Sequence, residues 1–561
     1  MQPSTDLQPT DDLLWLEDIH GQGPLDWVRE QNDRTESLLG SDRFSALHRD
    51  LTAILDAPDR IPHVSKRGGW YYNFWRDGEH PRGLWRRTRW EPYLAGEPDW
   101  EVLLDVDALA AEEGTEWVFS GARLLRPDWD RALLRLSPDG GDAVAVREFD
   151  LTTRSFVTAP DGFELPVAKT QVSWISRDRL LVGTVTDPEA ETGDATRSSY
   201  ARTLRVLDRG ERLEAAETVF SVDPGHVAAF GVHDSTPGWE RTVAVDAIDF
   251  YDSTTWLRDP DGTGGARPGW RQLEVPLDAE VDVHRQWLTV FLKSEWELPG
   301  AVHPAGSLLV CTVDGFLDGS EEPRPAFLPS TGSTLSAWDW TASHLVLTVL
   351  QDVSSALYVL PQSALAAPDP GRPAPRLALD ATRRIHLDNP NPADPFLTLG
   401  VGAVDDEDPD CGDDLWITAT GALTPPTLLR TTLPAHLGDA GTGSRPADVV
   451  PGLVTVRTGP ERFDASGLVV RQHFAVSDDG TRVPYFQIGP ADLEPDGANP
   501  VLMDGYGGFL ASKLPGYSGV YGRGWLTRRN AAGRQGVHVI ANIRGGGEYG
   551  PDWHRAALKQ N

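Results

Sequence analysis

The feature that most constrains the fold is a series of short strand-like segments that fills residues 61–460. Segments rich in β-branched and aromatic residues are separated by Gly, Pro and Asp turns, for example at 70–75, 144–149, 180–184, 344–349 and 415–418. A region of about 400 residues without a long helical pattern exceeds a single sandwich. A β-propeller distributes such strands over blades of roughly 40–50 residues, which gives about seven to nine blades. Because no repeat motif is visible, two stacked β-sandwiches stay open as the alternative.

Length and charge bound the number of domains and the kind of partner. The chain has 561 residues, and domains usually hold roughly 100–200, so two or three domains are expected. The net charge of −33 repels nucleic acid and anionic lipid. We therefore expect no nucleic acid and no membrane as a partner.

Cysteine usage and the N-terminus indicate the compartment. Cys311 and Cys411 are the only cysteines and form no CxxC pair, which excludes a disulfide scaffold and a zinc ribbon but leaves one bridge between them open. The N-terminus has neither the basic nor the apolar region of a signal peptide, and apolar segments such as 307–313 are too short to span a membrane. These features predict a cytoplasmic protein.

The two ends of the chain differ in pattern from the strand-rich region. The first 60 residues are expected to be helical, because apolar residues recur at spacings of three and four. After Arg471 the sequence predicts a hairpin at 473–486, strands at 500–503 and 537–543 that run into glycine turns, and a helix over 553–560. Strands followed by glycine turns and helices indicate an α/β sheet. Because the chain ends inside that helix, we expect an α/β domain that is truncated.

Two short motifs suggest a nucleotide or phosphate site but lack essential parts. Gly545, Gly547 and Gly550 form the G-x-G-x-x-G pattern of a dinucleotide site, yet the chain ends 11 residues later, before the acidic residue that binds ribose. Residues 508–513 resemble a phosphate-binding loop without the second Gly before Lys513. We expect no nucleotide cofactor.

Two acidic or histidine-containing groups suggest a metal site, with similar defects. The segment 406–410 imitates the start of a calcium loop, but Cys411 stands at the position of the essential Gly, so a solvated acidic loop is expected. His63, Asp77 and His80 lack metal-ligand spacing and are interpreted as surface or turn residues. The sequence therefore predicts no metal.

A stronger candidate is a pair of glycine-rich segments at 504–509 and 541–550. In an α/β-hydrolase, the loop after an early strand supplies one hydrogen-bond donor to the oxyanion hole. Glycines let the backbone approach the reacting carbonyl, and the Tyr506 hydroxyl is a suitable donor, of a kind whose removal typically costs about 2.7–4 kcal/mol of transition-state stabilisation. The alternative is that Tyr506 only packs and the glycines only form turns, which composition alone favours.

These segments resemble, in order and spacing, the start of the catalytic domain of prolyl oligopeptidases. The similar residues there are Gly-Tyr-Gly-Gly-Phe at 505–509, Asn-Ile-Arg-Gly-Gly-Gly-Glu-Tyr-Gly at 542–550, Trp553-His554, and Lys-Gln-Asn at 559–561. The opening Trp-Leu-Glu-Asp at 15–18, with Trp27-Val28 and Gln31-Asn32, is similar to that family's first helices, and 479–486 to its return from propeller to hydrolase.

Details within the resemblance bear on specificity. Asn542-Ile-Arg544 and Tyr549 favour the prolyl type over the related oligopeptidase that cuts after basic residues. The segments 71–75 and 82–88 look like those of a bacterial subgroup.

The resemblance implies a multidomain β plus α/β fold, in which a seven-bladed β-propeller is inserted near the start of an α/β-hydrolase domain that is incomplete at its C-terminus. The expected parts are an N-terminal helical segment packing with the hydrolase (1–60), the propeller (61–460), and the first part of the catalytic domain (461–561). The site would lie in a cavity between the domains that admits only short peptides. By resemblance, Tyr506 corresponds to the oxyanion-hole tyrosine and Phe509 to an aromatic wall of the proline pocket.

The nucleophilic Ser, the Asp and the His follow these motifs in this family, and none is present here. No G-x-S-x-G occurs, since 516–520 fails at its last position, and His554 precedes the place of the nucleophile and is interpreted as structural. We expect a serine endopeptidase that hydrolyses short proline-containing peptides on the carboxyl side of proline, is a monomer, and is inactive as this chain alone. The alternative is a peptide- or partner-binding propeller with a vestigial hydrolase segment, and the reading frame beyond Asn561 separates the two.

Overall fold

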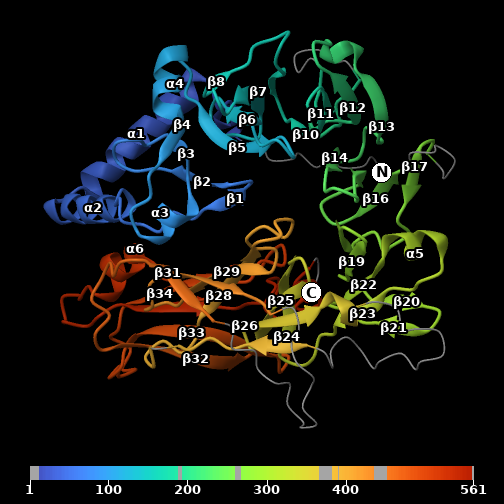
Figure 1. Cartoon of the computed structure of the whole chain (residues 1–561). Coiled ribbons are helices and arrows are strands. Elements are labelled where there is room, and N and C mark those ends of the chain that lie inside the picture. The colour runs from blue at the N-terminus through green and yellow to red at the C-terminus, as the bar shows by residue number, and fades with distance from the viewer. Residues whose placement is uncertain are drawn as a thin grey trace, which may run out of the picture.

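The structure, a computed structural model, describes residues 12–186, 193–259, 267–365, 382–389, 391–434 and 452–558 (Figure 1). The first described elements are a short helix η1 (Leu14–Glu17) and two longer ones, α1 (Gln22–Leu39) and α2 (Asp42–Leu55). Pro24 lies in the first turn of α1, where its missing N–H is not needed. Ser41 caps α2, because its hydroxyl accepts a hydrogen bond from the backbone N–H of Phe44 at 3.2 Å.

Seven antiparallel sheets of four or five strands follow in the described residues, and all but the fifth are built from consecutive strands. The first four are sheet 1 (β1 Ser65–Arg67, β2 Trp70–Trp75, β3 Leu84–Thr88, β4 Glu101–Asp105), sheet 2 (β5 Val118–Leu124, β6 Arg131–Ser137, β7 Val144–Asp150, β8 Ser155–Phe156, β9 Glu164–Ala168), sheet 3 (β10 Gln171–Ser176, β11 Arg179–Gly183, β12 Thr203–Asp208, β13 Glu217–Ser221) and sheet 4 (β14 Ala228–Asp234, β15 Arg241–Ala247, β16 Ser253–Arg258, β17 Trp270–Gln272).

The other three sheets complete the series. They are sheet 5 (β18 Glu280–His284, β19 Trp287–Phe291, β22 Leu308–Thr312, β23 Arg324–Phe327, with the hairpin β20 Trp296–Leu298 and β21 Ala301–His303 inserted), sheet 6 (β24 Ser333–Trp340, β25 His344–Gln351, β26 Ser354–Pro361, β27 Arg383–Ile385) and sheet 7 (β28 Thr398–Ala403, β29 Asp414–Thr420, β30 Thr427–Thr432, β31 Val454–Thr458). Short helices connect some strands: α3 (Trp90–Leu94), α4 (Val106–Glu113), η2 (Leu213–Ala215), α5 (Val313–Asp318) and η3 (Gln362–Ala364).

Buried apolar side chains fill the space between each sheet and the next, as in the cluster that Trp85 of sheet 1 shares with Leu134 of sheet 2. The series closes on itself between sheets 7 and 1. There Tyr93 shares a cluster with Leu428 and Val456, next to Trp90 and Trp416. Sheets that follow one another around a common axis define a β-propeller, so the stacked-sandwich alternative is excluded (Figure 1).

The acidic segment after β28 corrects one expectation. Within 406–410, Asp410 is exposed as expected, but the side chains of Asp406 and Glu407 are only 25% and 17% exposed and each pairs with a cation from another sheet. The prediction was wrong for a physical reason. The partner cations are distant in sequence, and only closure of the ring brings them to this loop.

The C-terminal segment (residues 461–558) has a four-stranded mixed sheet in the order β32-β33-β35-β34. Strands β32 (Leu468–Val476) and β33 (Arg482–Pro490) form an antiparallel hairpin, whereas β34 (Val501–Gly505) and β35 (Val537–Ala541) run parallel. Helices α6 (Gly519–Tyr521) and η5 (Gly522–Leu526) make the crossover, and α7 (Pro551–Arg555) follows β35. A parallel pair joined by a crossover is the pattern of an α/β sheet. The helix expected over 553–560 was predicted too long, because α7 ends at Arg555. Residues 559–561 lie outside the described residues.

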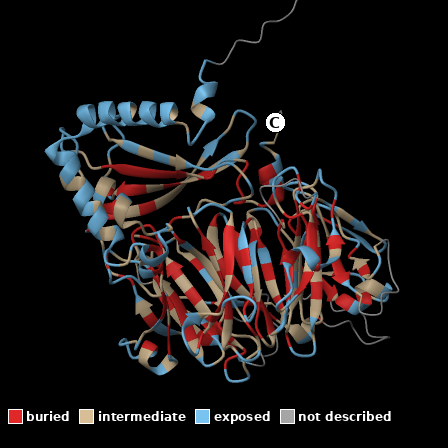
Figure 2. Ribbon diagram, turned by 90° about the horizontal axis from the view of Figure 1, so that it is seen from above, coloured by how far each residue is buried: buried red, intermediate tan, exposed pale blue. Residues whose placement is uncertain are grey.

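The N-terminal helices lie beside the C-terminal segment. The Asp50 carboxylate of α2 is 3.8 Å from the Arg523 guanidinium and 3.9 Å from that of Arg528. Figure 2 shows the two long helices in pale blue, and α1 has no buried residue, with Leu38 and Leu39 exposed. The helices thus attach to the C-terminal segment by one side of α2 and leave apolar side chains in solvent.

Candidate functional site

The candidate oxyanion loop follows directly on β34, which lies at the edge of the C-terminal sheet. Its side chains Tyr506 and Phe509 are 44% and 68% exposed. No hydrogen bond among the described residues uses the Tyr506 hydroxyl, which therefore is available to a ligand. Phe509 and Leu510 have φ of +53° and +57°, a left-handed conformation that costs a non-glycine residue roughly 1 kcal/mol or more. Such strain persists only where neighbouring structure holds it.

The glycine turn after β35 supplies that support. A Cβ on Gly545 would lie 2.3 Å from the carbonyl oxygen of Gly507, and one on Gly547 would lie 2.0 Å from that of Leu510. Both distances are far below a van der Waals contact, so the two backbones touch as only glycines permit. The glycines therefore serve loop-to-loop packing, which argues against a nucleotide in this turn.

A buried carboxylate fixes the same two loops from inside. Glu548 is almost fully buried, and its Oε1 accepts hydrogen bonds from the Lys513 backbone N–H at 2.8 Å and from Asn542 Nδ2 at 3.2 Å. Burial raises the pKa of Glu548. The Lys513 ammonium pairs with Asp504 of β34 at 2.8 Å, so it is already neutralised and the phosphate-loop alternative loses its cation.

His554 of α7 holds the glycine turn. It is buried, and its Nδ1 donates to the Gly545 carbonyl oxygen at 2.6 Å. Its ring lies 6.2 Å from the ring of Tyr251, which belongs to the β15–β16 turn of sheet 4. His554 thus has a structural place between the loop and the propeller. Ser518, the serine of the incomplete G-x-S-x-G, caps α6 by accepting from the Tyr521 N–H at 3.2 Å.

Several propeller turns contact this segment, among them those of sheets 4, 5 and 6, and the sequence did not indicate any of them. Besides Tyr251, the Tyr549 hydroxyl lies 3.2 Å from Asp352 Oδ1 in the β25–β26 turn, and Arg555 donates to the Lys293 carbonyl oxygen at 2.5 Å. Burial, together with the adjacent Asp352 carboxylate, raises the pKa of Tyr549. Each of these turns joins the second strand of its sheet to the third. The candidate site therefore faces the end of the propeller at which these turns lie.

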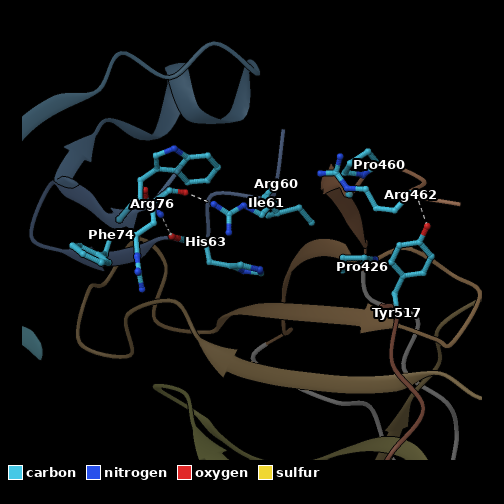
Figure 3. Close-up of a pocket in the computed structure, with 12 residues that line it drawn as sticks. Arg60, Ile61, His63, Phe74, Arg76, Pro426, Pro460, Arg462 and Tyr517 are labelled. Atoms are coloured by element: carbon cyan, nitrogen blue, oxygen red, sulfur yellow. Dashed lines mark hydrogen bonds between the residues drawn. The ribbon is translucent and has the colours of Figure 1, made fainter. Parts of the chain in front are cut away.

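The two chain crossings between propeller and C-terminal segment lie side by side around a cavity of about 490 Å³ (Figure 3). Arg60 and His63 belong to the first crossing, Pro460 and Arg462 to the second, and Tyr517 contributes from the C-terminal segment. Arg462 pairs with Asp59, which ties the crossings together. In Figure 3 the two groups of side chains face each other across the cavity. His63 lines this cavity, while His80 only pairs with Asp77 in a turn.

The described residues were also compared with the expectations on metal ligands, on the two cysteines and on membrane-spanning helices. Among the described residues no cluster of three or more His, Cys, Asp or Glu is arranged to hold a metal ion. Cys311 and Cys411 are both buried and free, so the bridge left open by the sequence is not formed. In the described part of the chain, no helix combines the length and apolarity needed to cross a bilayer.

Propeller, mixed α/β sheet and glycine-braced loop together define the class of propeller-capped α/β-hydrolases. Residues 4–387 match the family model described as the prolyl oligopeptidase N-terminal β-propeller domain. An uncharacterized peptidase of Sinorhizobium fredii is 34% identical over 98% of this chain and 70% of that protein. The chain belongs to the prolyl oligopeptidase family.

Two further relatives carry more explicit names. A prolyl endopeptidase of Elizabethkingia miricola is 33% identical over 26% of this chain and 18% of its own length. A solved post-proline cleaving enzyme from Rickettsia typhi aligns with a TM-score of 0.80 and 25% identity, covering 97% of this chain and 73% of that one. The family assignment made from residues 505–509 and 542–550 is confirmed, whereas the roles of Tyr506 and Phe509 stay predictions.

Proposed function

We propose that this chain carries the seven-bladed propeller and the oxyanion-hole portion of a serine endopeptidase that cleaves short peptides on the carboxyl side of proline. The observation that carries the proposal is the strained loop 506–510, which presents the Tyr506 hydroxyl to solvent while Gly545 and Gly547 brace it from behind. A preorganised donor of this kind stabilises the oxyanion of an acyl-transfer transition state. The exposed Phe509 ring beside it offers an apolar wall to a proline ring.

The chemistry follows from these roles. A serine hydroxyl, deprotonated by a histidine, attacks the carbonyl after proline, and the carbonyl oxygen becomes an oxyanion that Tyr506 hydrogen-bonds. The sequence 1–561 holds the donor without the nucleophile motif, so this chain alone is proposed to be inactive. Purified residues 1–561 should release no product from a fluorogenic peptide, and a stoichiometric burst free of contaminating peptidase would contradict this.

The proline preference is tested on an active enzyme that contains this chain together with a nucleophile. Matched fluorogenic peptides with Pro, Ala or Arg before the cleaved bond should rank with Pro first. A preference for Arg would instead place the specificity with the related oligopeptidases that cut after basic residues.

In the same enzyme, Tyr506→Phe removes the proposed donor. Because the hydrogen bond strengthens only as the oxyanion develops, kcat should fall by about 10²–10³ with little change in KM. Tyr521→Phe, at a similarly exposed tyrosine of α6, is the matched control. Equal activity of Tyr506→Phe and the control would remove Tyr506 from the reaction.

A further inference from the structure

Sheets 5 and 6 leave a cavity of about 490 Å³ between their first strands, β18 and β24. Its wall combines carboxylates with aromatic rings and, among the described residues that line it, contains no Lys, Arg or His. The carboxylates are those of Glu280, Asp282 and Asp339, and the rings are those of Phe291, Trp338 and Trp340. A wall of this composition attracts cations, and it supplies none of its own.

The cavity is separate from the candidate site. Second strands end at the turns that face the C-terminal segment, so the antiparallel first strands begin at this facing end and finish at the opposite, remote end of the propeller. The loop 404–413, which follows the first strand of sheet 7, also lies at the remote end. Glu280 is the first residue of β18 and Trp340 the last of β24, so the cavity extends along the inner strands between the two ends.

The Asp282 carboxylate has no counter-ion within the described part of the chain. The one charged side chain that acts on it is Asp339, which is another carboxylate. Burial, and then the Asp339 carboxylate, raise the pKa of Asp282. A poorly solvated carboxylate without a cation is costly to the folded protein, and a bound cation relieves that cost.

Asp339 is held in place by neutral donors. Its Oδ1 accepts a hydrogen bond from the Trp340 backbone N–H at 2.8 Å, and its Oδ2 accepts one from the Ala403 N–H at 2.8 Å. These bonds orient the carboxylate without neutralising it, and each oxygen keeps capacity for a second donor. The two carboxylates of the cavity are thus fixed, close enough to influence each other, and without a cation between them.

The two tryptophans offer complementary contacts. The Trp338 ring lies 6.0 Å from the Phe291 ring and lines the cavity, and an indole face attracts cations. Trp340 is only 4% exposed, and its indole N–H has no hydrogen-bond partner within reach in the described residues. This N–H acts on the Asp282 carboxylate only at longer range. A buried donor left unsatisfied beside a cavity is suited to an acceptor atom of a ligand.

The backbone of β24 is irregular at the cavity. Its register against β25 shifts between Leu335 and Ala337, which makes Ser336 the extra residue of a β-bulge. Bulges re-aim side chains and are over-represented next to functional sites. Ser336 and Ala337 are exposed, so the cavity is open to solvent directly before Trp338 and Asp339.

We propose that this cavity binds the guanidinium group of an arginine-containing peptide, with Asp282 and Asp339 as its counter-charges and the Trp338 ring as a cation–π partner. The Trp340 indole N–H then donates to a carbonyl oxygen of the same peptide. A guanidinium is favoured over an ammonium because it is planar, weakly hydrated and stacks on aromatic rings. The inference goes beyond the proposed function, since it requires neither a nucleophile nor a role for Tyr506.

Binding is measured by isothermal titration calorimetry of the chain 1–561 with Nα-acetyl-arginine amide. Nα-acetyl-citrulline amide is the matched control ligand, because it has the same shape and carries no charge. The arginine amide should bind saturably at one site, and the citrulline amide should bind at least about tenfold more weakly. Equal affinity for the two ligands, or no saturable binding of the arginine amide at millimolar concentrations, would overturn the proposal.

Asp282→Asn locates the binding site. It should weaken binding of the arginine amide by about tenfold, because it removes a poorly solvated counter-charge. The matched control is Asp234→Asn in β14, which removes the same charge from another first strand outside the cavity. Asp234 Oδ1 accepts from the Thr236 N–H at 2.9 Å, a bond that Asn retains. Equal losses in the two variants would reduce the effect to overall charge and contradict the assigned site.

Stability of the chain without ligand separates a binding carboxylate from a structural one. Because Asp282 has no counter-ion there, Asp282→Asn should keep or raise the Tm of the unliganded chain. A large fall in Tm, or failure to fold, would show that Asp282 serves the fold, and the proposal would be wrong. The comparison of arginine and citrulline amides on the unaltered chain does not depend on this variant.

Discussion

The two ends of the propeller are held in different ways. At the end remote from the C-terminal segment, the loop 405–411 ties sheets together through buried or partly buried charges such as Lys66 and Arg285. At the facing end, Val353, Ala422 and Leu423 of the propeller turns share a buried apolar cluster with the C-terminal segment, and hydrogen bonds such as that between Tyr549 and Asp352 add to it. The remote opening is therefore held mainly by charge, and the facing end mainly by apolar packing.

The two ends of the propeller also differ in the exposure of their side chains. The facing end has the exposed side chains Tyr251, Tyr506 and Phe509, which a soluble peptide can contact. The remote end has carboxylates that would be costly to leave without their cations, because solvent reaches them poorly.

The largest loss of stability is expected when the ion pairs at the remote end of the propeller are removed. Lys66→Ala leaves Asp405 and Asp408 without their shared ammonium group, and Lys66 is only 7% exposed. The free energy of unfolding should fall by on the order of 3 kcal/mol in urea denaturation. Lys169→Ala, at a lysine that donates to the Ser198 carbonyl oxygen at 3.3 Å and lies 4.2 Å from the centre of the Tyr200 ring, should cost no more than about 1 kcal/mol. Similar losses for both variants would mean that the remote end is not held by charge.

The remote end should also respond to acid through His284. Burial, and then the nearby Arg285 cation, lower the pKa of His284 to about 4, and its ring stacks on Trp340 at 5.2 Å. Its Nε2 lies 3.6 Å from Asp406 Oδ2, the carboxylate that faces it. Below its usual pKa of about 6.5 the unfolded chain binds a proton that the folded chain does not. Stability is therefore full above pH 6.5 and lost between pH 6.5 and about 4, by roughly 3 kcal/mol in total.

His284→Gln tests this window. Its unfolding free energy should fall less than that of the unaltered chain between pH 6.5 and 4, measured by urea denaturation at each pH. His48→Gln, at an exposed position on α2, should keep the original slope. Parallel slopes for His284→Gln and the unaltered chain would show that His284 does not couple stability to pH.

A smaller effect is expected at the facing end. Tyr549→Phe removes the hydrogen bond to Asp352, which contributes about 1 kcal/mol. Amide exchange in 545–550 should accelerate roughly fivefold, with little change in global unfolding. Tyr358→Phe, which loses a bond from Gln351 on the surface of sheet 6, should leave exchange there unchanged. Global destabilisation by Tyr549→Phe equal to that of Lys66→Ala would abolish the contrast between the two ends.

Much of the local structure was predictable, because it depends on neighbours in sequence. The strand predicted over 70–75 is β2, and those predicted at 144–149 and 344–349 lie within β7 and β25. The close glycines of 545–547 were recognisable because only glycine allows such contact, and that spacing is carried in the chain itself. The expected helix over 553–560 was too long, since α7 ends at Arg555.

The sequence alone determined the alternation of short strands and turns, the change to an α/β pattern after residue 460, and the family through its glycine-rich segments. Only the tertiary structure decided which charges meet. The acidic loop, expected to be solvated, is bound by Lys66 and Arg285, whose places in the chain give no hint of it. Hydrophobic alternation and glycine requirements act over a few residues, whereas ring closure unites residues hundreds of positions apart.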